Sequence, residues 1–244
     1  MLQSLFTVVK NEKIADNTYE MVLSGNTAEL KAGGFVNIKL DGFYLRRPIS
    51  VCDYDDTTLT IIYKAVGKGT DYMSGLCKGE SLDVLTGLGN GYDITKSGDK
   101  VLLIGGGAGV PPMYRMCKEL IYAGKSVTAI LGFNTASEVF YEDEFKSLGA
   151  DVKVATADGS YGIKGFVTDA MDGVEYEYFY TCGPEPMLKA VYNATDVSGQ
   201  FSFEERMGCG FGACMGCSCK TITGYKRICK DGPVLEKEEI LWAD

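Results

Sequence analysis

The hydrophobic pattern of this chain changes its period once, near residue 98, and this change limits the folds open to the chain. Between Leu5 and about Asp93 the apolar residues form short alternating runs such as "LFTVVK", "GFVNIKL" and "TLTIIYKAV", with Gly, Asn and Asp turns between them. Such runs are typical of antiparallel barrels and sandwiches. The sequence therefore predicts an all-β domain over residues 1–97, with one short helix at "GTDYMSGLC".

From Lys100 the pattern becomes strand, helix, strand. The run "KVLLIGGG" is continuously apolar, as expected of a strand buried on both faces. The segment "PPMYRMCKELIYAGK" has an apolar helical face, proline at its start and Gly124 past its end. Further strands are expected at "SVTAILGF", "DVKVATA" and "EYFYTCG", and helices at "VFYEDEFKSLG" and "EPMLKAVYNATD". This alternation predicts a doubly wound parallel sheet over residues 98–200.

The third region, residues 201–244, combines a cysteine loop with a predicted hairpin at "CKTITGYKRICKDGPVL". Cys209-x4-Cys214-x2-Cys217, with Cys229 further along, has the plant-type [2Fe–2S] spacing. We therefore predict that these four thiolates are metal ligands and that Cys219 is not, because the spacing is complete without it. A zinc site with four thiolates is the alternative, although zinc loops usually present two CxxC pairs.

Composition excludes several classes of function. The chain has no histidine, so acid–base catalysis by histidine, Cys/His zinc sites and Rieske clusters are excluded. A net charge of −9 without a long basic run argues against a nucleic-acid partner. No apolar run is long enough to span a membrane, and the N-terminus lacks a signal-peptide pattern. We therefore expect a cytoplasmic protein with reduced cysteines, of which Cys52, Cys77 and Cys117 lie in apolar patterns and are predicted to be core.

Two segments on the predicted parallel sheet have the character of a nucleotide site. "IGGGAGVPPM" follows a strand and begins a helix, with the spacing Gly107-x-Gly109-x-x-Pro112. Its glycines allow backbone N–H groups to approach a pyrophosphate at the helix N-terminus, whereas the alternative is a tight strand–helix turn. "TCGPEPM" follows a later strand, at the edge where such sheets bind ligands, and is a weak signal by itself.

The predicted all-β domain contains a candidate anion site in "RRPIS", residues 46–50. Two adjacent arginines within an apolar strand are costly unless they meet anions, and arginine binds phosphate in a bidentate manner. The alternative is a solvated edge strand carrying protective charges.

Taken together, these motifs resemble the ferredoxin–NADP reductase superfamily, in which a barrel holds flavin and a sheet holds nicotinamide. The residues that match the superfamily in order are Arg47, Ser50, Gly107, Gly109, Pro112, Cys182, Gly183 and Met187. The resemblance implies that Arg47 meets the FAD pyrophosphate, that Ser50 approaches flavin N5, and that Cys182 and Gly183 lie beside the nicotinamide. Ser50 and Cys182 are thus the implied catalytic residues. The implied FAD lining also includes Pro48, Ile49, Ile62, Tyr63, Lys64, Gly69 and Thr70. Ile49 stands where many members have a flavin-stacking tyrosine.

With its cysteine loop, the chain most resembles the electron-transfer subunits of type B dihydroorotate dehydrogenases, through "LRRPISVC", "VATADGSYGIKGFVTD" and "ERMGCGFGACMGCSCK". The resemblance implies FAD, a [2Fe–2S] cluster and NAD as cofactors. It also implies an FMN-containing catalytic partner, with two copies of each chain, in pyrimidine biosynthesis. The alternatives are small subunits of sulfide dehydrogenases, bifurcating ferredoxin–NADP⁺ oxidoreductases or hydrogenases. A freestanding NAD(P)H:acceptor reductase and a zinc-stabilised binding protein also remain open.

Two further expectations concern the nucleotide and the partner. Asn134, Thr135 and Ser137 follow the second predicted strand of the sheet, and Asp158, with Lys164 as its counter-charge, follows the third. A 2′-phosphate favours nearby arginine, so this acidic balance predicts NAD rather than NADP. In the cysteine loop, "FGACMG" places Phe211, Ala213 and Met215 among glycines. We expect these apolar residues to be exposed and to form a docking face, whereas the alternative is that they pack on the barrel.

Overall fold

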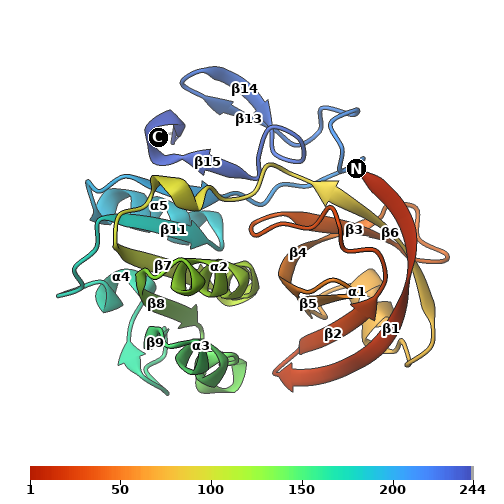
Figure 1. Cartoon of the computed structure of the whole chain (residues 1–244), viewed down its shortest axis with the longest axis horizontal. Coiled ribbons are helices and arrows are strands. Elements are labelled where there is room, and N and C mark those ends of the chain that lie inside the picture. Colours follow the sequence, from red (N-terminus) through yellow and green to blue (C-terminus); the bar gives the residue numbers. More distant parts are fainter. Residues whose placement is uncertain (243–244) are drawn as a thin grey trace.

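The computed structural model describes residues 1–242 and shows three parts, a barrel, a sheet with helices on both faces, and a C-terminal region that lies across the top of both (Figure 1). The predicted all-β domain is a closed antiparallel barrel in which the strands follow the order β1-β2-β5-β4-β3-β6. Its strands are β1 (Leu2–Ala15), β2 (Thr18–Ser24), β3 (Phe35–Lys39), β4 (Arg47–Tyr54), β5 (Thr58–Lys64) and β6 (Ser81–Leu88). The expected short helix is α1 (Lys68–Ser74).

Alternation of apolar residues builds the barrel core. In β5, Leu59, Ile61 and Tyr63 point inward and are buried, as the strand period requires. Ile62 is also buried although it points outward, because the helix that follows the glycine loop covers the barrel wall at this place. Cys52 on β4 is buried in the same way, as predicted. The barrel is thus apolar inside and also on the patch of its wall that meets the sheet.

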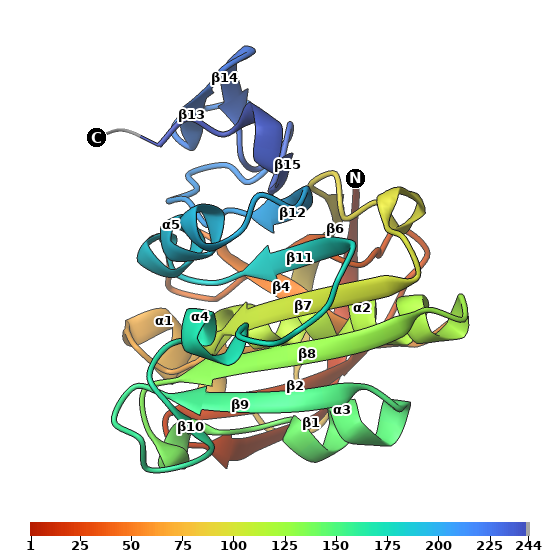
Figure 2. The ribbon, with the colours of Figure 1, turned by 90° about the vertical axis from the view of Figure 1, so that its left-hand side faces the viewer.

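The second part is a seven-stranded sheet with the order β10-β9-β8-β7-β11-β12-β15, shown face-on in Figure 2. Its strands are parallel except β15, which pairs with β12 in the antiparallel direction. The bounds of the strands are β7 (Lys100–Gly106), β8 (Ser126–Phe133), β9 (Asp151–Thr156), β10 (Ile163–Lys164), β11 (Tyr178–Cys182), β12 (Gly199–Ser202) and β15 (Val234–Glu236).

Helices cover both faces of this sheet, as a doubly wound fold requires. On the face toward the barrel lie α2 (Val110–Tyr122) and α3 (Glu142–Leu148), and on the other face lie α4 (Val167–Ala170) and α5 (Glu185–Ala194). The predicted apolar side of α2 is buried, including Met113, Met116, Cys117 and Leu120. Four short 3-10 helices complete the chain over the described residues: η1 (Ile94–Lys96), η2 (Gly107–Gly109), η3 (Ala136–Glu138) and η4 (Lys237–Glu239).

The C-terminal region contains the predicted hairpin, formed by β13 (Ser218–Thr221) and β14 (Gly224–Arg227). Strands β12 and β15 were not predicted, and they fasten this region to the sheet. One prediction about the cysteines was wrong. Cys77 is exposed, because α1 ends at Ser74, before the end of the predicted helix, and leaves Cys77 in the turn before β6.

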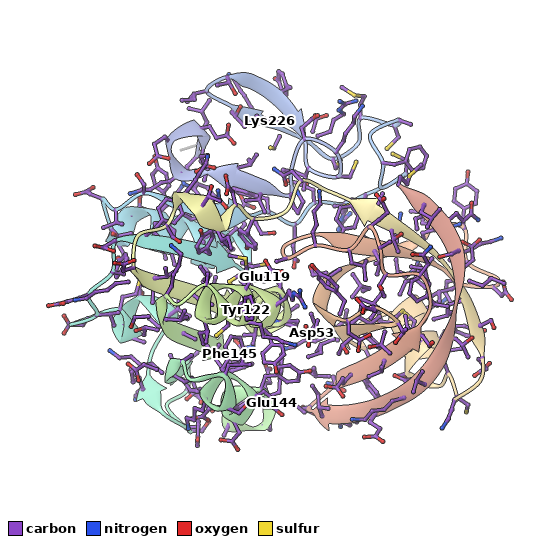
Figure 3. The ribbon with its side chains drawn as sticks, in the orientation of Figure 1. Asp53, Glu119, Tyr122, Glu144, Phe145 and Lys226 are labelled. Carbon is purple, nitrogen blue, oxygen red and sulfur yellow. The ribbon has the colours of Figure 1, made fainter. Side chains whose placement is uncertain are left out.

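Polar contacts hold the barrel against the sheet. Asp53 lies between the barrel and α2 (Figure 3), where its carboxylate meets Lys118 Nζ at 2.7 Å and Arg115 Nη1 at 3.3 Å. Lys64 pairs with Glu138 at 2.9 Å, and the Tyr141 hydroxyl donates to Glu20 at 2.6 Å. These contacts hold the barrel and the sheet in a fixed relative orientation. In this orientation, Ala108 at the carboxyl edge of the sheet faces the barrel strands β4 and β5. Across residues 1–242, no helix is long and apolar enough to cross a membrane.

Candidate flavin, nicotinamide and iron–sulfur sites

A cavity of about 270 Å³ opens where the barrel, the sheet and the C-terminal region meet. Predicted flavin residues from three elements line it, namely Pro48, Ile49, Ser50, Ile62, Tyr63, Lys64 and Thr70. Ala108, between the predicted pyrophosphate glycines, lines the other side. Seven predicted flavin residues therefore share one cavity with Ala108 of the glycine loop, although they lie far apart in the sequence. The predicted residues Arg47 and Gly69, and the predicted nicotinamide residues, are not part of this lining.

The adjacent arginines at the start of β4 have different surroundings. Arg46 pairs with Asp83 at 2.9 Å and donates to the backbone oxygens of Asn37 and Asp83 at 3.2 and 3.0 Å. Arg47 has no carboxylate partner among the described residues. Its guanidinium lies 5.0 Å from the ring centroid of Phe43 and packs on Gly69 at the start of α1. Arg46 is therefore committed to the fold, and Arg47 remains able to bind an anion.

Three of the predicted flavin residues already have polar partners. The Thr70 hydroxyl accepts from the backbone N–H of Val66 at 3.0 Å and donates to the Gly67 carbonyl, so it caps its own helix. The Tyr63 hydroxyl donates to Asn11 at 2.9 Å, and burial raises its pKa. Lys64 is held by its ion pair with Glu138. These side chains shape the cavity wall, and their polar ends point to the protein.

The nicotinamide motifs come together at the carboxyl edge of the sheet. β7 and β11 are neighbours, with Gly105 opposite Cys182, so the glycine loop and the Cys–Gly turn lie side by side. A Cβ atom at Gly109 would lie 2.1 Å from the carbonyl oxygen of Cys182, so this approach requires glycine. Pro112 is buried in the first turn of α2, and the Met187 side chain covers Gly183 from α5.

Cys182 itself is buried beneath this edge. Its side chain is 1% exposed, and it lies opposite Ser202 of β12, which lines the cavity. Burial raises the pKa of the Cys182 thiol well above its usual value, so the thiol stays neutral near pH 7. Ser50 faces the cavity directly. The two predicted catalytic residues therefore lie at different depths around the cavity, and their catalytic roles remain predictions.

Backbone N–H groups of the cysteine region point at two of the predicted sulfur ligands. The N–H of Cys214 donates to Cys209 Sγ at 3.4 Å, and the N–H of Cys229 donates to Cys217 Sγ at 3.4 Å. Burial opposes ionisation of Cys209, but backbone N–H groups of the loop outweigh it and lower the pKa of the thiol to about 6. One of these donors is Ala213, whose nitrogen lies 3.2 Å from Cys209 Sγ. Within residues 1–242, no three Cys, Asp or Glu side chains lie close enough together to hold a metal ion, so the four predicted ligands are not gathered into one group. Hydrogen bonds from backbone N–H groups to sulfur nevertheless suit thiolates that hold an iron–sulfur cluster.

Comparison with known proteins decides the family. Residues 204–241 match the family model described as the iron-sulfur cluster binding domain of dihydroorotate dehydrogenase B, and residues 103–193 match an oxidoreductase NAD-binding domain. A relative from Geobacillus sp. (strain WCH70), named dihydroorotate dehydrogenase B (NAD(+)), electron transfer subunit, is 44% identical over 256 residues, which cover 99% of each chain. One of the same name from Fusobacterium nucleatum is 47% identical over 93% of this chain and 94% of its own.

The chain belongs to the family of dihydroorotate dehydrogenase B electron transfer subunits. These matches confirm the resemblance and the predicted oxidoreductase class, and they favour iron–sulfur over zinc. Among solved structures, an NADH-dependent reduced ferredoxin-NADP oxidoreductase superposes with a TM-score of 0.90 at 32% identity, over 98% of this chain and 90% of that chain. Phthalate dioxygenase reductase superposes with a TM-score of 0.66 at 20% identity, over 79% of this chain and 64% of that chain, which supports the fold alone.

One wall of the cavity was not predicted from the sequence. This wall consists of Ser202, which ends β12, and of Phe203, Glu204, Glu205 and Met207, which follow it. Glu204 is exposed at the rim of this cavity. The alternation in "QFSF" could have indicated a strand, because Phe201 is fully buried and Phe203 packs on Trp242. No local pattern indicates that the residues after this strand face the barrel.

Proposed function

We propose that this chain transfers electrons from an FMN-containing dihydroorotate dehydrogenase catalytic subunit to NAD⁺, through a [2Fe–2S] cluster and FAD. One observation carries the proposal. The cavity lined by Ile49 and Ser50 is also lined by Met207, two residues before Cys209. The candidate flavin site and the candidate cluster loop are therefore adjacent. A flavin between the other two groups is chemically necessary, because a cluster passes single electrons whereas NAD⁺ accepts a hydride.

The proposed roles follow from the surroundings of each residue. Arg47, free of carboxylates, binds the FAD pyrophosphate, and Ser50 faces the flavin ring. Gly107, Gly109 and Pro112 receive the NAD pyrophosphate, and Cys182, Gly183 and Met187 support the nicotinamide. Cys209, Cys214, Cys217 and Cys229 hold the cluster. We accordingly propose functional units of residues 1–97 for FAD, 98–200 for NAD and 201–244 for the cluster, with β12 and β15 joining the last two.

Charges at the carboxyl ends of β8 and β9 support a preference for NAD over NADP. Glu138 accepts from Asn134 at 3.2 Å and neutralises Lys64, so this lysine is not free to bind a phosphate. Asp158 accepts from the backbone N–H and the hydroxyl of Ser160, which lower the pKa of the carboxyl. A 2′-phosphate would meet two carboxylates here, which disfavours it.

The cluster loop supports docking of the catalytic subunit. Phe211 and Met215 are 43% and 56% exposed, and Ala213 is exposed beside them, as predicted. Adjacent exposed apolar groups next to a candidate redox site suit a partner surface. We propose that two copies of each chain assemble in the cytoplasm.

The test is anaerobic co-expression with the catalytic subunit, followed by tandem purification. We expect one complex that reduces NAD⁺ with dihydroorotate, whereas this chain alone does not. Phe211→Glu should weaken assembly while FAD and iron contents stay unchanged. Tyr122→Glu is the matched control, because Tyr122 is 95% exposed at the far end of α2. Unaided oxidation of dihydroorotate by this chain, or unchanged assembly of Phe211→Glu, would contradict the proposal.

A second candidate is a small subunit of the kind found in ferredoxin–NADP oxidoreductases. The overlay at a TM-score of 0.90 over 98% of this chain favours it, since that structure shares all three parts. The same purification distinguishes the two candidates. If the chain is captured with a ferredoxin-dependent subunit and not with one that binds dihydroorotate, the second candidate is correct.

A further inference from the structure

The cluster loop touches the barrel through a buried asparagine. Asn37 lies on β3, and its side-chain Nδ2 donates to the backbone oxygen of Cys209 at 3.2 Å. Asn37 is 2% exposed, so water does not compete for this bond. The bond connects two segments that are 172 residues apart, one in the barrel and one in the cysteine loop.

The same residue is rigidly attached to the strand that lines the cavity. β3 pairs with β4 so that Asn37 lies opposite Pro48, and Val36 lies opposite Ile49. The backbone oxygen of Asn37 also accepts from Arg46, whose guanidinium is fixed by Asp83. A displacement of the Cys209 loop relative to the cavity wall must therefore break or stretch the bond from Asn37.

Asn37 carries a cost that a residue needed only for packing would not carry. Its Oδ1 atom is buried and lacks a hydrogen-bond partner among the described residues. Burying an unpaired acceptor is unfavourable, and an apolar residue of similar shape, such as leucine, would avoid this cost. The loop is also shaped around the amide. A Cβ atom at Gly210, where φ is +80°, would lie 2.3 Å from Asn37 Nδ2.

The other half of the cluster loop is anchored separately. Asn90, which follows β6, donates from its side chain to the Val234 oxygen at 2.7 Å and accepts from the Val234 nitrogen at 3.0 Å. Its backbone nitrogen donates to the Gly232 oxygen. The segment after Cys229 is therefore held to the barrel without Asn37. Loss of the Asn37 bond should loosen residues 209–213 and leave the Cys217–Cys229 side in place.

We propose that Asn37 is a positioning residue for electron transfer, which holds the Cys209 side of the cluster at a fixed distance from the flavin cavity. This inference rests on the proposed function. It assigns to a barrel residue outside the cavity lining a specific effect on one step, transfer between flavin and cluster. Reduction of the flavin by NADH occurs at the other side of the cavity and should not depend on Asn37.

The test compares Asn37→Ala and Asn37→Ser in the purified full chain. Amide hydrogen exchange is the readout independent of activity, and Asn37→Ala should accelerate exchange at residues 210–213 but not at residues 217–229. Anaerobic stopped-flow mixing with NADH should show unchanged flavin reduction and slower cluster reduction, because the Cys209 side of the loop is no longer held against β3. Asn37→Ser retains a shorter donor, so its amide exchange and its rate of cluster reduction should lie between those of Asn37→Ala and the wild type. Asn26→Ala, on an exposed barrel turn, is the matched control and should match the wild type.

The possible results separate a failure of the role of Asn37 from a failure of the proposed function. Unchanged exchange and unchanged cluster reduction in Asn37→Ala overturn the inference, and so does loss of the cluster from both Asn37 variants. Equal slowing of flavin and cluster reduction also overturns it, because the effect would then be global. If the wild-type cluster is not reduced after NADH reduces the flavin, the proposed function fails instead.

Discussion

The two neighbouring arginines of β4 provide a sharp test, because their structural surroundings predict opposite effects. Arg47 lacks a carboxylate partner among the described residues and donates to the Leu45 oxygen at 2.5 Å, so Arg47→Ala should destabilise the apoprotein less than Arg46→Ala. A charge-assisted bond to pyrophosphate is worth ~1.5–3 kcal/mol, so the dissociation constant of FAD should rise roughly 10- to 150-fold. Arg47→Lys should give an intermediate value, because lysine does not bind phosphate in a bidentate manner.

Arg46→Ala is the matched control. It removes an ion pair and two hydrogen bonds from a side chain that is 20% exposed. Partial burial makes a loss of about 2 kcal/mol reasonable, which corresponds to a fall in Tm of about 4–8 °C for a chain of this size. FAD affinity at a temperature where both variants are folded should remain that of the wild type.

The assay combines FAD titration of the apoproteins, followed by flavin fluorescence, with thermal unfolding of the same samples. The reasoning is refuted if Arg47→Ala binds FAD like the wild type. It is equally refuted if Arg46→Ala loses FAD affinity while its Tm is unchanged, because the two arginines would then have exchanged roles.

Three further predictions concern the cluster, the nucleotide and acid stability. Serine at Cys209, Cys214, Cys217 or Cys229 should remove or strongly destabilise the cluster, whereas Cys219→Ser should retain it. Iron content and electron paramagnetic resonance measure this, and loss of iron in Cys219→Ser alone would show the ligand set to be wrong. Steady-state kcat/KM should be higher for NADH than for NADPH, and a higher value for NADPH would contradict the charge argument at Glu138 and Asp158. Asp55 accepts from the backbone N–H groups of Thr57 and Thr58 at 2.8 Å, and these bonds lower its pKa to about 2. A lowered pKa stabilises the fold above the unfolded value near 3.8, and this contribution is lost as the pH falls through about 2. Asp55→Asn should therefore show a flatter dependence of unfolding free energy on pH between these values, measured by urea denaturation, and an unchanged slope would count against the assignment.

The sequence alone determined the features that depend on local periodicity and spacing. The six barrel strands, the four strands with their helices and the cysteine hairpin lie where the alternation, the helical faces and the turn residues indicated. The short glycine-rich loop between Cys209 and Cys214 also curls back on itself, with the Cys214 N–H 3.4 Å from Cys209 Sγ. Such signals lie within roughly ten residues, where covalent geometry limits the conformations.

The tertiary structure decided which of these elements meet. Sequence could not separate Arg46 from Arg47, since their different roles depend on Asp83, which lies on another strand. It also did not indicate β15, whose three residues gain their stability from pairing with β12. Two further features also depend on segments that are distant in the sequence. They are the cavity wall after β12, which includes Phe203 and Met207, and the bond from Asn37 to Cys209. Contacts between distant segments form only after the barrel and the sheet have packed, and no local pattern of side chains encodes their partners.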